Sequence, residues 1–181
     1  MVQSPSVPDM ISQSREVLTK PSVATFEKFE KSGNFTNAII YVAIAAAITG
    51  IFGLGQGLGG FLSGIISTLL GFVVFTYLVH WIGKQRGGTG TFDEVAYTFA
   101  LFWAPLAVLF GAATLLLVIT IIGVFLLPIL ALVGIAANVY FAYMAVQSSM
   151  NLEAGGKTWG TLLLAGLGAF VFNIIVSNII T

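Results

Sequence analysis

Residues 95–152 contain no charged side chain: VAYTFALFWAPLAVLFGAATLLLVITIIGVFLLPILALVGIAANVYFAYMAVQSSMNL. One membrane-spanning helix needs about 20 apolar residues to cross a hydrocarbon core of about 30 Å. The stretch is therefore long enough for two spans. Alternation of apolar and polar residues, which marks a membrane β-barrel, is not sustained over segments of about ten residues. The expected spans are helices.

The rest of the chain follows the same pattern. Acidic, basic and histidine side chains are confined to residues 1–31, 80–94 and 153–157, so residues 32–79 and 158–181 are uncharged as well. Overall, 57% of the residues are hydrophobic and 8% are charged, against about 25% charged in an average soluble domain. The sequence predicts an all-α, polytopic integral membrane protein with two spans in each long stretch and one in the last.

Glycine and proline divide the two long stretches. The run GLGQGLGG at residues 53–60 interrupts the first. Gly123 and Pro128 interrupt the second, because proline is tolerated best in the first turn of a helix. We expect a transmembrane domain over residues 37–181, a five-helix bundle with spans at about 37–54, 60–82, 93–117, 128–149 and 159–180.

Lysine and arginine predict the orientation of this bundle. All seven lie before the first span, between the second and third, or between the fourth and fifth. The positive-inside rule then places the N-terminus in the cytoplasm and the C-terminus outside. A four-span arrangement, the weaker alternative, would divide these residues six to one. Trp81 and Trp159 fit aromatic anchors at the cytoplasmic interface.

Residues 1–36 form a polar N-terminal arm. Two short helical patterns flank its Pro21, and the first, over about 10–20, contains a Glu16–Lys20 pair four residues apart. The second follows Ser22 as a helix N-cap. Its apolar face carries Val23, Phe26 and Phe29. We expect an interfacial amphipathic helix in the headgroup plane. Docking of a partner or sensing of curvature is the alternative to a simple lead-in helix.

Three ionisable residues near the second and third spans are the candidates for chemistry: His80, Asp93 and Glu94. The spacing from Thr91 to Glu94 predicts a capping box that opens the third span, with both acids at a helix N-terminus. This interpretation explains both carboxylates without a substrate. A single histidine at the interface lacks the several ligands that a metal site needs. We therefore expect no catalytic and no metal-binding residues.

Composition excludes further classes of function. The formal net charge is zero, so the chain has no basic field that would gather nucleic acid. The absence of cysteine excludes disulfides, thiolate metal sites and thiol nucleophiles. A GxGxxG pattern at residues 55–60 follows an apolar helix rather than a strand, so we expect no nucleotide cofactor.

Beyond the two acids that open the third span, the expected spans hold no Asp, Glu, Lys or Arg, the residues that usually mark ion pathways in membranes. Their polar residues are Asn138, Tyr140, Tyr143 and Gln147 in the fourth span, and Asn173, Ser177 and Thr181 in the fifth. The last three recur every four residues and form one stripe. Hydrogen bonding between helices is the first interpretation. The alternative is a polar path for water or a small solute along Asn138, Asn173 and Ser177.

Residues 87–105, GGTGTFDEVAYTFALFWAP, join a glycine-rich loop to a helix that carries Ala-Pro. The residues of this pattern are Gly87, Gly88, Gly90, Thr91, Phe92, Ala104 and Pro105. REVLTKPSVATFEKF, at residues 15–29, precedes the first long span in a similar order. In the order and spacing of these motifs the chain resembles the Yip1 domain family over about residues 15–180.

The resemblance implies five spans, a cytoplasmic N-terminus and a non-enzymatic role. Eukaryotic members of that family sit in Golgi and endoplasmic-reticulum membranes, associate with Rab GTPases and with one another, and are connected with vesicle traffic and membrane shaping. This chain lacks their long cytosolic N-terminal region and their DLYGP-type and GY-type signatures. It looks more like the compact prokaryotic members, so a Rab-type partner is not carried over. The implied location is the cytoplasmic membrane of a bacterium or archaeon.

These observations lead to two hypotheses about function. The first is a membrane-organising or adaptor protein that works with membrane lipids and with a second copy of itself or another membrane protein. Residues 10–31 and the loop 83–94 would form its cytoplasmic face. The second is a small passive channel or transporter for an ion or small solute, through the polar residues of the fourth and fifth spans.

Overall fold

The structure is a computed structural model that describes residues 4–51 and 57–180, without the side chains of 121, 122 and 177–180. All regular secondary structure in this part of the chain is helical. The helices are α1 (Val7–Thr19), α2 (Val23–Phe29), α3 (Phe35–Ile51), α4 (Gly57–Gln85), α5 (Phe92–Val118), α6 (Ile121–Val124), α7 (Leu127–Ser149) and α8 (Gly156–Ile180). The prediction of an all-α chain is confirmed over the described residues.

Four of these helices, α4, α5, α7 and α8, are long and apolar enough to cross a membrane. The structure thus supports a multi-pass membrane protein. The fifth expected span corresponds to α3, which has 17 residues and is about 25 Å long at 1.5 Å per residue. Its predicted end at residue 54 lies outside the described residues. The count of five spans stays a prediction.

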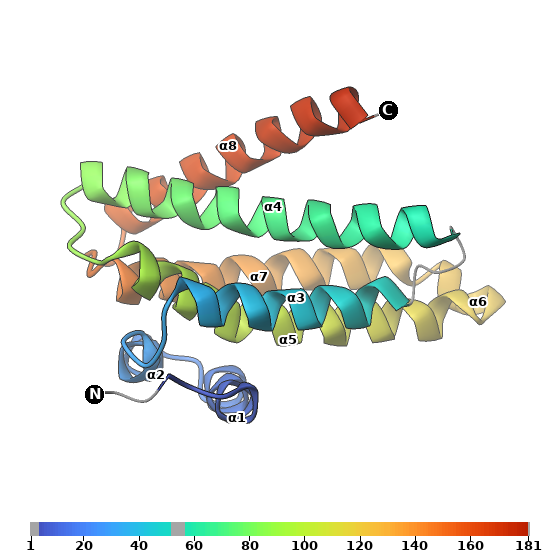
Figure 1. Cartoon of the computed structure of the whole chain (residues 1–181), viewed down its shortest axis with the longest axis horizontal. Helices are drawn as coiled ribbons and strands as arrows, with labels where there is room; N and C mark the ends of the chain where they lie inside the picture. The colour runs from blue at the N-terminus through green and yellow to red at the C-terminus, as the bar shows by residue number, and fades with distance from the viewer. Residues whose placement is uncertain (1–3, 52–56, 181) are drawn as a thin grey trace.

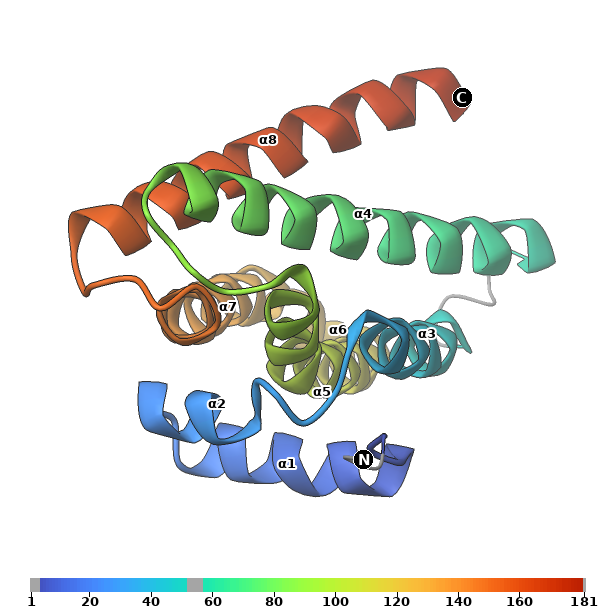
Figure 2. The ribbon, with the colours of Figure 1, turned by 60° about the vertical axis from the view of Figure 1, so that its left-hand side comes forward.

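The helices form three layers. One layer contains α4 and α8, which cross each other, and the next contains α3, α5 and α7 side by side (Figure 1). The third layer consists of α1 and α2, whose axes run crosswise to the long helices α3, α5 and α7 (Figure 2). Because successive long helices alternate in direction, the α4–α5 loop, the α7–α8 loop and the N-terminal arm lie at the same end of the molecule (Figure 1).

Side-chain caps define most helix starts at this end. Ser6 with Asp9 forms a capping box at α1, and Thr91 with Glu94 forms one at α5. Each pair satisfies backbone N–H groups that have no partner within the helix. Ser22 caps α2, as the sequence predicts. The capping box at Ser6 explains why α1 begins three residues earlier than the expected position 10.

Gly123 and Pro128 lie where the second long stretch changes from one helix to the next. Helix α5 ends at Val118, α6 makes a single turn that includes Gly123, and α7 begins at Leu127 with Pro128 in its first turn. Proline is accommodated there because the first N–H groups of a helix lack an intrahelical partner. Of the glycine-rich run at residues 53–60, residues 53–56 lie outside the described part of the chain, and residues 57–60 form the first turn of α4.

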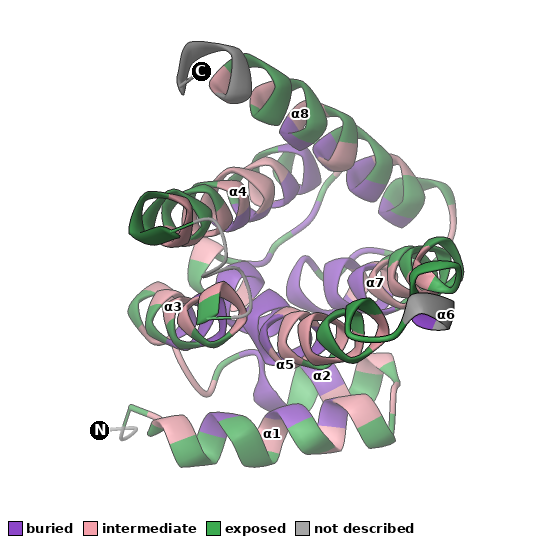
Figure 3. Ribbon diagram, turned by 90° about the vertical axis from the view of Figure 1, so that its right-hand side faces the viewer, coloured by how far each residue is buried: buried purple, intermediate pink, exposed green. Residues whose placement is uncertain are grey.

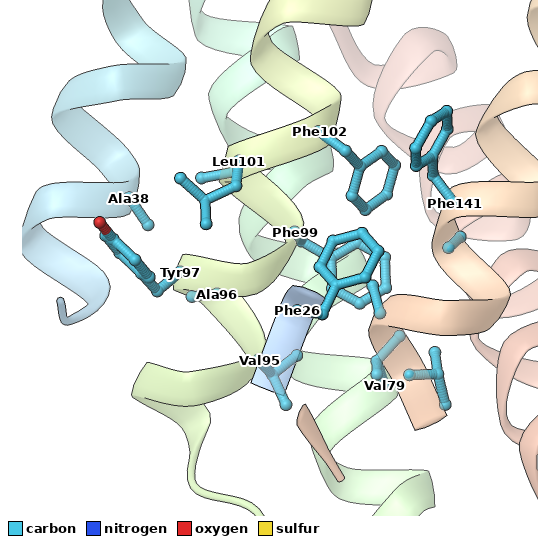
Figure 4. Packing of buried hydrophobic residues seen from close by; sticks show 14 of the residues in the cluster. Phe26, Ala38, Val79, Val95, Ala96, Tyr97, Phe99, Leu101, Phe102 and Phe141 are labelled. Atoms are coloured by element: carbon cyan, nitrogen blue, oxygen red, sulfur yellow. The ribbon is translucent and has the colours of Figure 1, made fainter. Parts of the chain in front are cut away.

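The core is centred on the first half of α5. Every residue from Val95 to Phe102 is buried, and α5 lies between α3 and α7 (Figure 3). The Phe102 ring packs on Phe99 at 5.3 Å and on Phe141 of α7 at 5.8 Å between ring centroids (Figure 4). Such aromatic pairs stabilise a core beyond the effect of the apolar area that they bury.

The N-terminal arm packs its apolar face on the bundle. Its two helices run crosswise to the long helices, and their buried residues contact α5 and α7 (Figure 3). The position of the arm in the headgroup plane stays a prediction. Met10, Val17 and Phe26 are fully buried, and the Phe26 ring meets Phe102 edge-on at 6.1 Å. The amphipathic pattern is correct, but the surface that it covers belongs to α5 and α7.

Candidate functional site: the charged end of the bundle

All charged side chains of the chain lie in the N-terminal arm, at the junction of α4 with α5, or at the junction of α7 with α8. They are Asp9, Arg15, Glu16, Lys20, Glu27, Lys28, Glu30, Lys31, Lys84, Arg86, Asp93, Glu94, Glu153 and Lys157. These three segments lie at one end of the molecule (Figure 1). We call this surface the charged end. It is the part of the molecule suited to polar contacts outside a membrane.

The glycines of the family pattern shape the α4–α5 loop. Gly87 has a φ of 90°, a left-handed conformation that glycine adopts without strain. The Gly88 N–H donates to the Gly83 carbonyl at 2.8 Å and the Gly87 N–H to the Lys84 carbonyl at 3.2 Å. These two bonds form a Schellman motif, which satisfies carbonyl groups at the end of α4.

Gly88 and Gly90 allow this loop to approach the end of α7. A Cβ on Gly90 would overlap the Ser149 carbonyl, and a Cβ on Gly88 would lie 2.7 Å from the Met150 Cε. The Thr89 N–H donates to the Met150 carbonyl at 3.0 Å, so the two segments are also joined by a backbone hydrogen bond. The glycine-rich pattern therefore has a structural cause, which is close contact between two loops.

The remaining residues of the family pattern belong to α5. Thr91 is the N-cap, and the Phe92 ring packs against Phe35 at 5.1 Å and His80 at 5.9 Å between centroids. Ala104 is buried, and Pro105 lies inside the helix. A proline there removes one backbone donor from the helix.

Asp93 and Glu94 have different structural roles. Glu94 completes the predicted capping box, since its carboxylate accepts from the Thr91 N–H at 2.7 Å. The Asp93 Oδ1 accepts from the backbone N–H of Phe35 at 2.9 Å. Asp93 therefore connects the start of α3 to the start of α5, across 58 residues of sequence. No local pattern indicates this second contact.

Glu30 is the buried carboxylate of the charged end. Its side chain is 5% exposed, and its Oε2 accepts from the Ser148 hydroxyl at 2.7 Å. Burial raises the pKa of Glu30 above its ordinary value, while the bond from Ser148 partly opposes that rise. This contact ties the end of α2 to the end of α7.

Two further hydrogen bonds attach α1 to the bundle. The Tyr97 hydroxyl donates to the Gln13 Oε1 at 2.7 Å, and the hydroxyls of Ser14 and Tyr41 lie 3.1 Å apart. Tyr97 is fully buried on α5, and Tyr41 is buried on α3. The arm is thus fixed to two helices of the bundle through polar groups as well as apolar ones.

The expected Glu16–Lys20 pair is replaced by another. The Lys28 ammonium contacts the Glu16 carboxylate at 2.7 and 2.9 Å, which joins α1 to α2. Lys20 follows the end of α1 with a non-helical φ of −131°. Side chains four residues apart are neighbours only where the backbone is helical, and Lys20 lies just beyond the end of α1.

The aromatic residues expected at the interface lie near the charged end. Trp81 is 53% exposed near the end of α4, and Trp159 is 41% exposed in the first turn of α8. The Trp159 ring packs on Tyr143 at 4.7 Å, and the Tyr143 hydroxyl accepts from the Gly155 N–H at 2.9 Å. Their role as membrane anchors stays a prediction.

The polar residues of the last two spans form local bonds. The Asn138 and Asn173 amides each donate to a carbonyl of their own helix at 2.9 Å, those of Gly134 and Ala169. The side chain of Ser177 and all of Thr181 lie outside the described part of the structure. A polar path along this stripe stays a prediction.

The long apolar helices and the single charged end define a polytopic α-helical membrane protein. The family model of the Yip1 domain matches residues 15–175, and the chain belongs to that family. This confirms the resemblance seen in the glycine-rich loop and the arm. No curated protein and no solved structure matches the chain.

Proposed function

We propose that this chain is a non-enzymatic adaptor or membrane-organising protein that binds a partner through its charged end. The observation that carries the proposal is the attachment of the arm. Buried Phe26, the Glu30–Ser148 bond and the Tyr97–Gln13 bond hold α1 and α2 on the bundle. A preformed surface loses less conformational entropy on binding than a free segment does.

We also propose five spans, with α3 as the first and the charged end in the cytoplasm. This arrangement puts all seven Lys and Arg residues on the cytoplasmic side, in agreement with the positive-inside rule. The cytoplasmic membrane of a bacterium or archaeon is the proposed location. The single histidine, His80, packs on the Phe92 ring, an environment that favours a structural role.

The partner of the proposed adaptor is another membrane protein or a second copy of this chain, in contact with membrane lipids. The exposed side chains of the arm include both signs of charge, for example Arg15, Lys20 and Glu27. A partner surface of complementary mixed charge would dock there and would be oriented by those charges.

The test is crosslinking in native membranes followed by mass spectrometry of the captured proteins. Removal of the whole arm would expose the bundle surface beneath Phe26, so charge reversal is the sharper change. The double variant Arg15→Glu and Lys20→Glu alters exposed residues that make no ion pair with the described residues. We expect capture of a specific partner to fall at least about fivefold, as for loss of about 1 kcal/mol of charge complementarity.

The control is Ser63→Ala, an exposed position in α4 far from the charged end. It should leave capture unchanged. Equal capture by wild type and the double variant, with both proteins folded, would contradict the proposal that the arm forms the docking surface.

A further inference from the structure

A cleft of about 520 Å³ lies between the two bundle layers. Its walls come from α4, α5, α7 and α8, with Phe72 and Phe102 among the deeper residues and Trp159 near the charged end. Almost all of the lining is apolar, and Asn138 is the amide among the lining residues. The size falls within the range of about 300–1,000 Å³ that is usual for small-ligand pockets.

The cleft opens sideways between α7 and α8. Val139 on α7 and Leu163 and Leu167 on α8 line it and are 39%, 59% and 62% exposed. Helix α8 diverges from α7 toward its C-terminus (Figure 3). The opening therefore faces the hydrocarbon region if these helices cross the bilayer.

The cleft runs along α8. From Trp159 to Leu167 it follows eight residues of that helix, a length of about 12 Å. An almost entirely apolar cleft that opens toward the hydrocarbon region suits a hydrocarbon chain, which has no polar group to leave without a partner.

A positive charge without an acidic partner among the described residues lies close to the helix that lines the cleft. The Arg86 guanidinium occupies the space that a side chain on Gly160 would take, and Gly160 directly follows Trp159 of the cleft lining. No carboxylate of the described residues lies within ion-pair distance of Arg86. The nearby Lys157 is paired with Glu153 at 3.4 Å. Guanidinium groups bind phosphate oxygens with two parallel hydrogen bonds.

We propose that the cleft binds one acyl chain of an anionic phospholipid whose phosphate contacts Arg86. The chain fills the apolar space between the layers, and the headgroup stays at the interface beside Trp159. An acyl chain in the cleft gives van der Waals contacts to lining side chains that would otherwise face an empty space. Arg86 selects anionic headgroups because none of the described carboxylates neutralises it.

The experiment uses the full chain purified in detergent and native mass spectrometry with added lipids. The probes are phosphatidylglycerol, which is anionic, and phosphatidylcholine with the same acyl chains. We expect wild type to retain one phosphatidylglycerol per chain, at least about tenfold more tightly than phosphatidylcholine, as a charge-assisted contact provides.

Two variants separate the chain site from the headgroup site. Gly166→Leu places a side chain into the cleft at a glycine with open space around it, and should abolish retention of both lipids. Arg86→Gln should remove the preference for phosphatidylglycerol. Gly64→Leu is the matched control, because Gly64 also has open space but does not line the cleft.

Each other outcome overturns the proposal. Retention that is equal in wild type and Gly166→Leu would show that the cleft does not hold the lipid. Equal affinity for the two headgroups in wild type would remove the role of Arg86. A dimer in place of a lipid-bound monomer would mean that a second copy covers the opening. Melting temperatures of all variants, compared with Gly64→Leu, show whether a loss of binding reflects unfolding.

Discussion

Glu30 of the N-terminal arm is a carboxylate buried against the end of α7. A carboxylate that is almost inaccessible to solvent and hydrogen-bonded to Ser148 is costly to ionise. Because burial raises its pKa in the folded state, the folded protein binds protons more readily than the unfolded chain does. The free energy of unfolding should then decrease as pH rises from the glutamate pKa of the unfolded chain toward the higher pKa of Glu30 in the folded protein.

The variant Glu30→Gln tests this. Glutamine keeps an acceptor for the Ser148 hydroxyl but does not ionise. We expect the variant to gain stability relative to wild type as pH rises from about 4 to 7, starting near the usual glutamate pKa of about 4.3. Thermal unfolding in detergent at several pH values measures the difference.

Glu27→Gln is the matched control, because Glu27 is exposed in the same short helix. This variant removes one carboxylate charge, as Glu30→Gln does, but the carboxylate that it removes is exposed rather than buried. A similar pH-dependent gain in both variants would mean that the negative charges of the arm, and not the burial of Glu30, cause the effect, since Glu27 is among the charges that raise the pKa of Glu30.

At the scale of elements, the α4–α5 loop and the end of α7 depend on glycine for their close contact. Gly90→Ala should destabilise the protein by about 1–3 kcal/mol or more, since its Cβ would overlap the Ser149 carbonyl and one segment must move. Gly87→Ala should cost about 1–2 kcal/mol because of its left-handed conformation. Denaturation in mixed micelles measures both changes.

Gly64→Ala provides the comparison within α4. A Cβ there meets no other atom, and alanine favours helix over glycine by about 1 kcal/mol. This variant should be neutral or more stable. If Gly90→Ala proved equally harmless, the contact between the two loops would be less close than the structure shows.

The positions of the helices can be predicted from the sequence, because the length of an apolar stretch, the charges that bound it and the capping residues are all local features. The starts of α5 and α7 agree with predictions within one residue, through the Thr91 capping box and Pro128. The contacts between helices cannot be predicted in this way. The amphipathic pattern of α2 indicates an apolar face but not that Phe26 meets Phe102, 76 positions along the chain.

The same limit applies to the candidate site. The glycines of the loop are recognisable by their pattern, whereas their cause, contact with Ser149 and Met150, requires the fold. Glu30 does not stand out among the charges of the arm, because no local signal distinguishes a carboxylate that will be buried. The cleft is formed by four helices together, so no single stretch of sequence encodes it.

At the scale of the whole molecule, the prediction concerns which end of the bundle faces the cytoplasm. The chain has no cysteine, so a single introduced thiol reports one position. With the charged end in the cytoplasm, an impermeant maleimide should label Phe125→Cys in intact cells, because Phe125 is exposed at the opposite end. Lys20→Cys and Lys157→Cys should react only after the membrane is permeabilised.

Labelling of Lys20→Cys in intact cells would contradict the proposed orientation. Labelling of Lys20→Cys and Lys157→Cys from opposite sides would contradict five spans, since an odd number of spans would then separate the two positions. The wild-type chain, which carries no thiol, controls for background reaction.

The docking of the arm has a consequence for how the protein is made. Glu30 and Ser148 are 118 residues apart, so at about 5–20 residues per second the partner of Glu30 is synthesised about 6–24 s later. Until α7 is complete, the apolar face around Phe26 is covered by α5 at most, because the α7 part of its contact surface is made last. A nascent chain would hold this face against the membrane surface or a chaperone, and the arm would move to its final position only when α7 is complete.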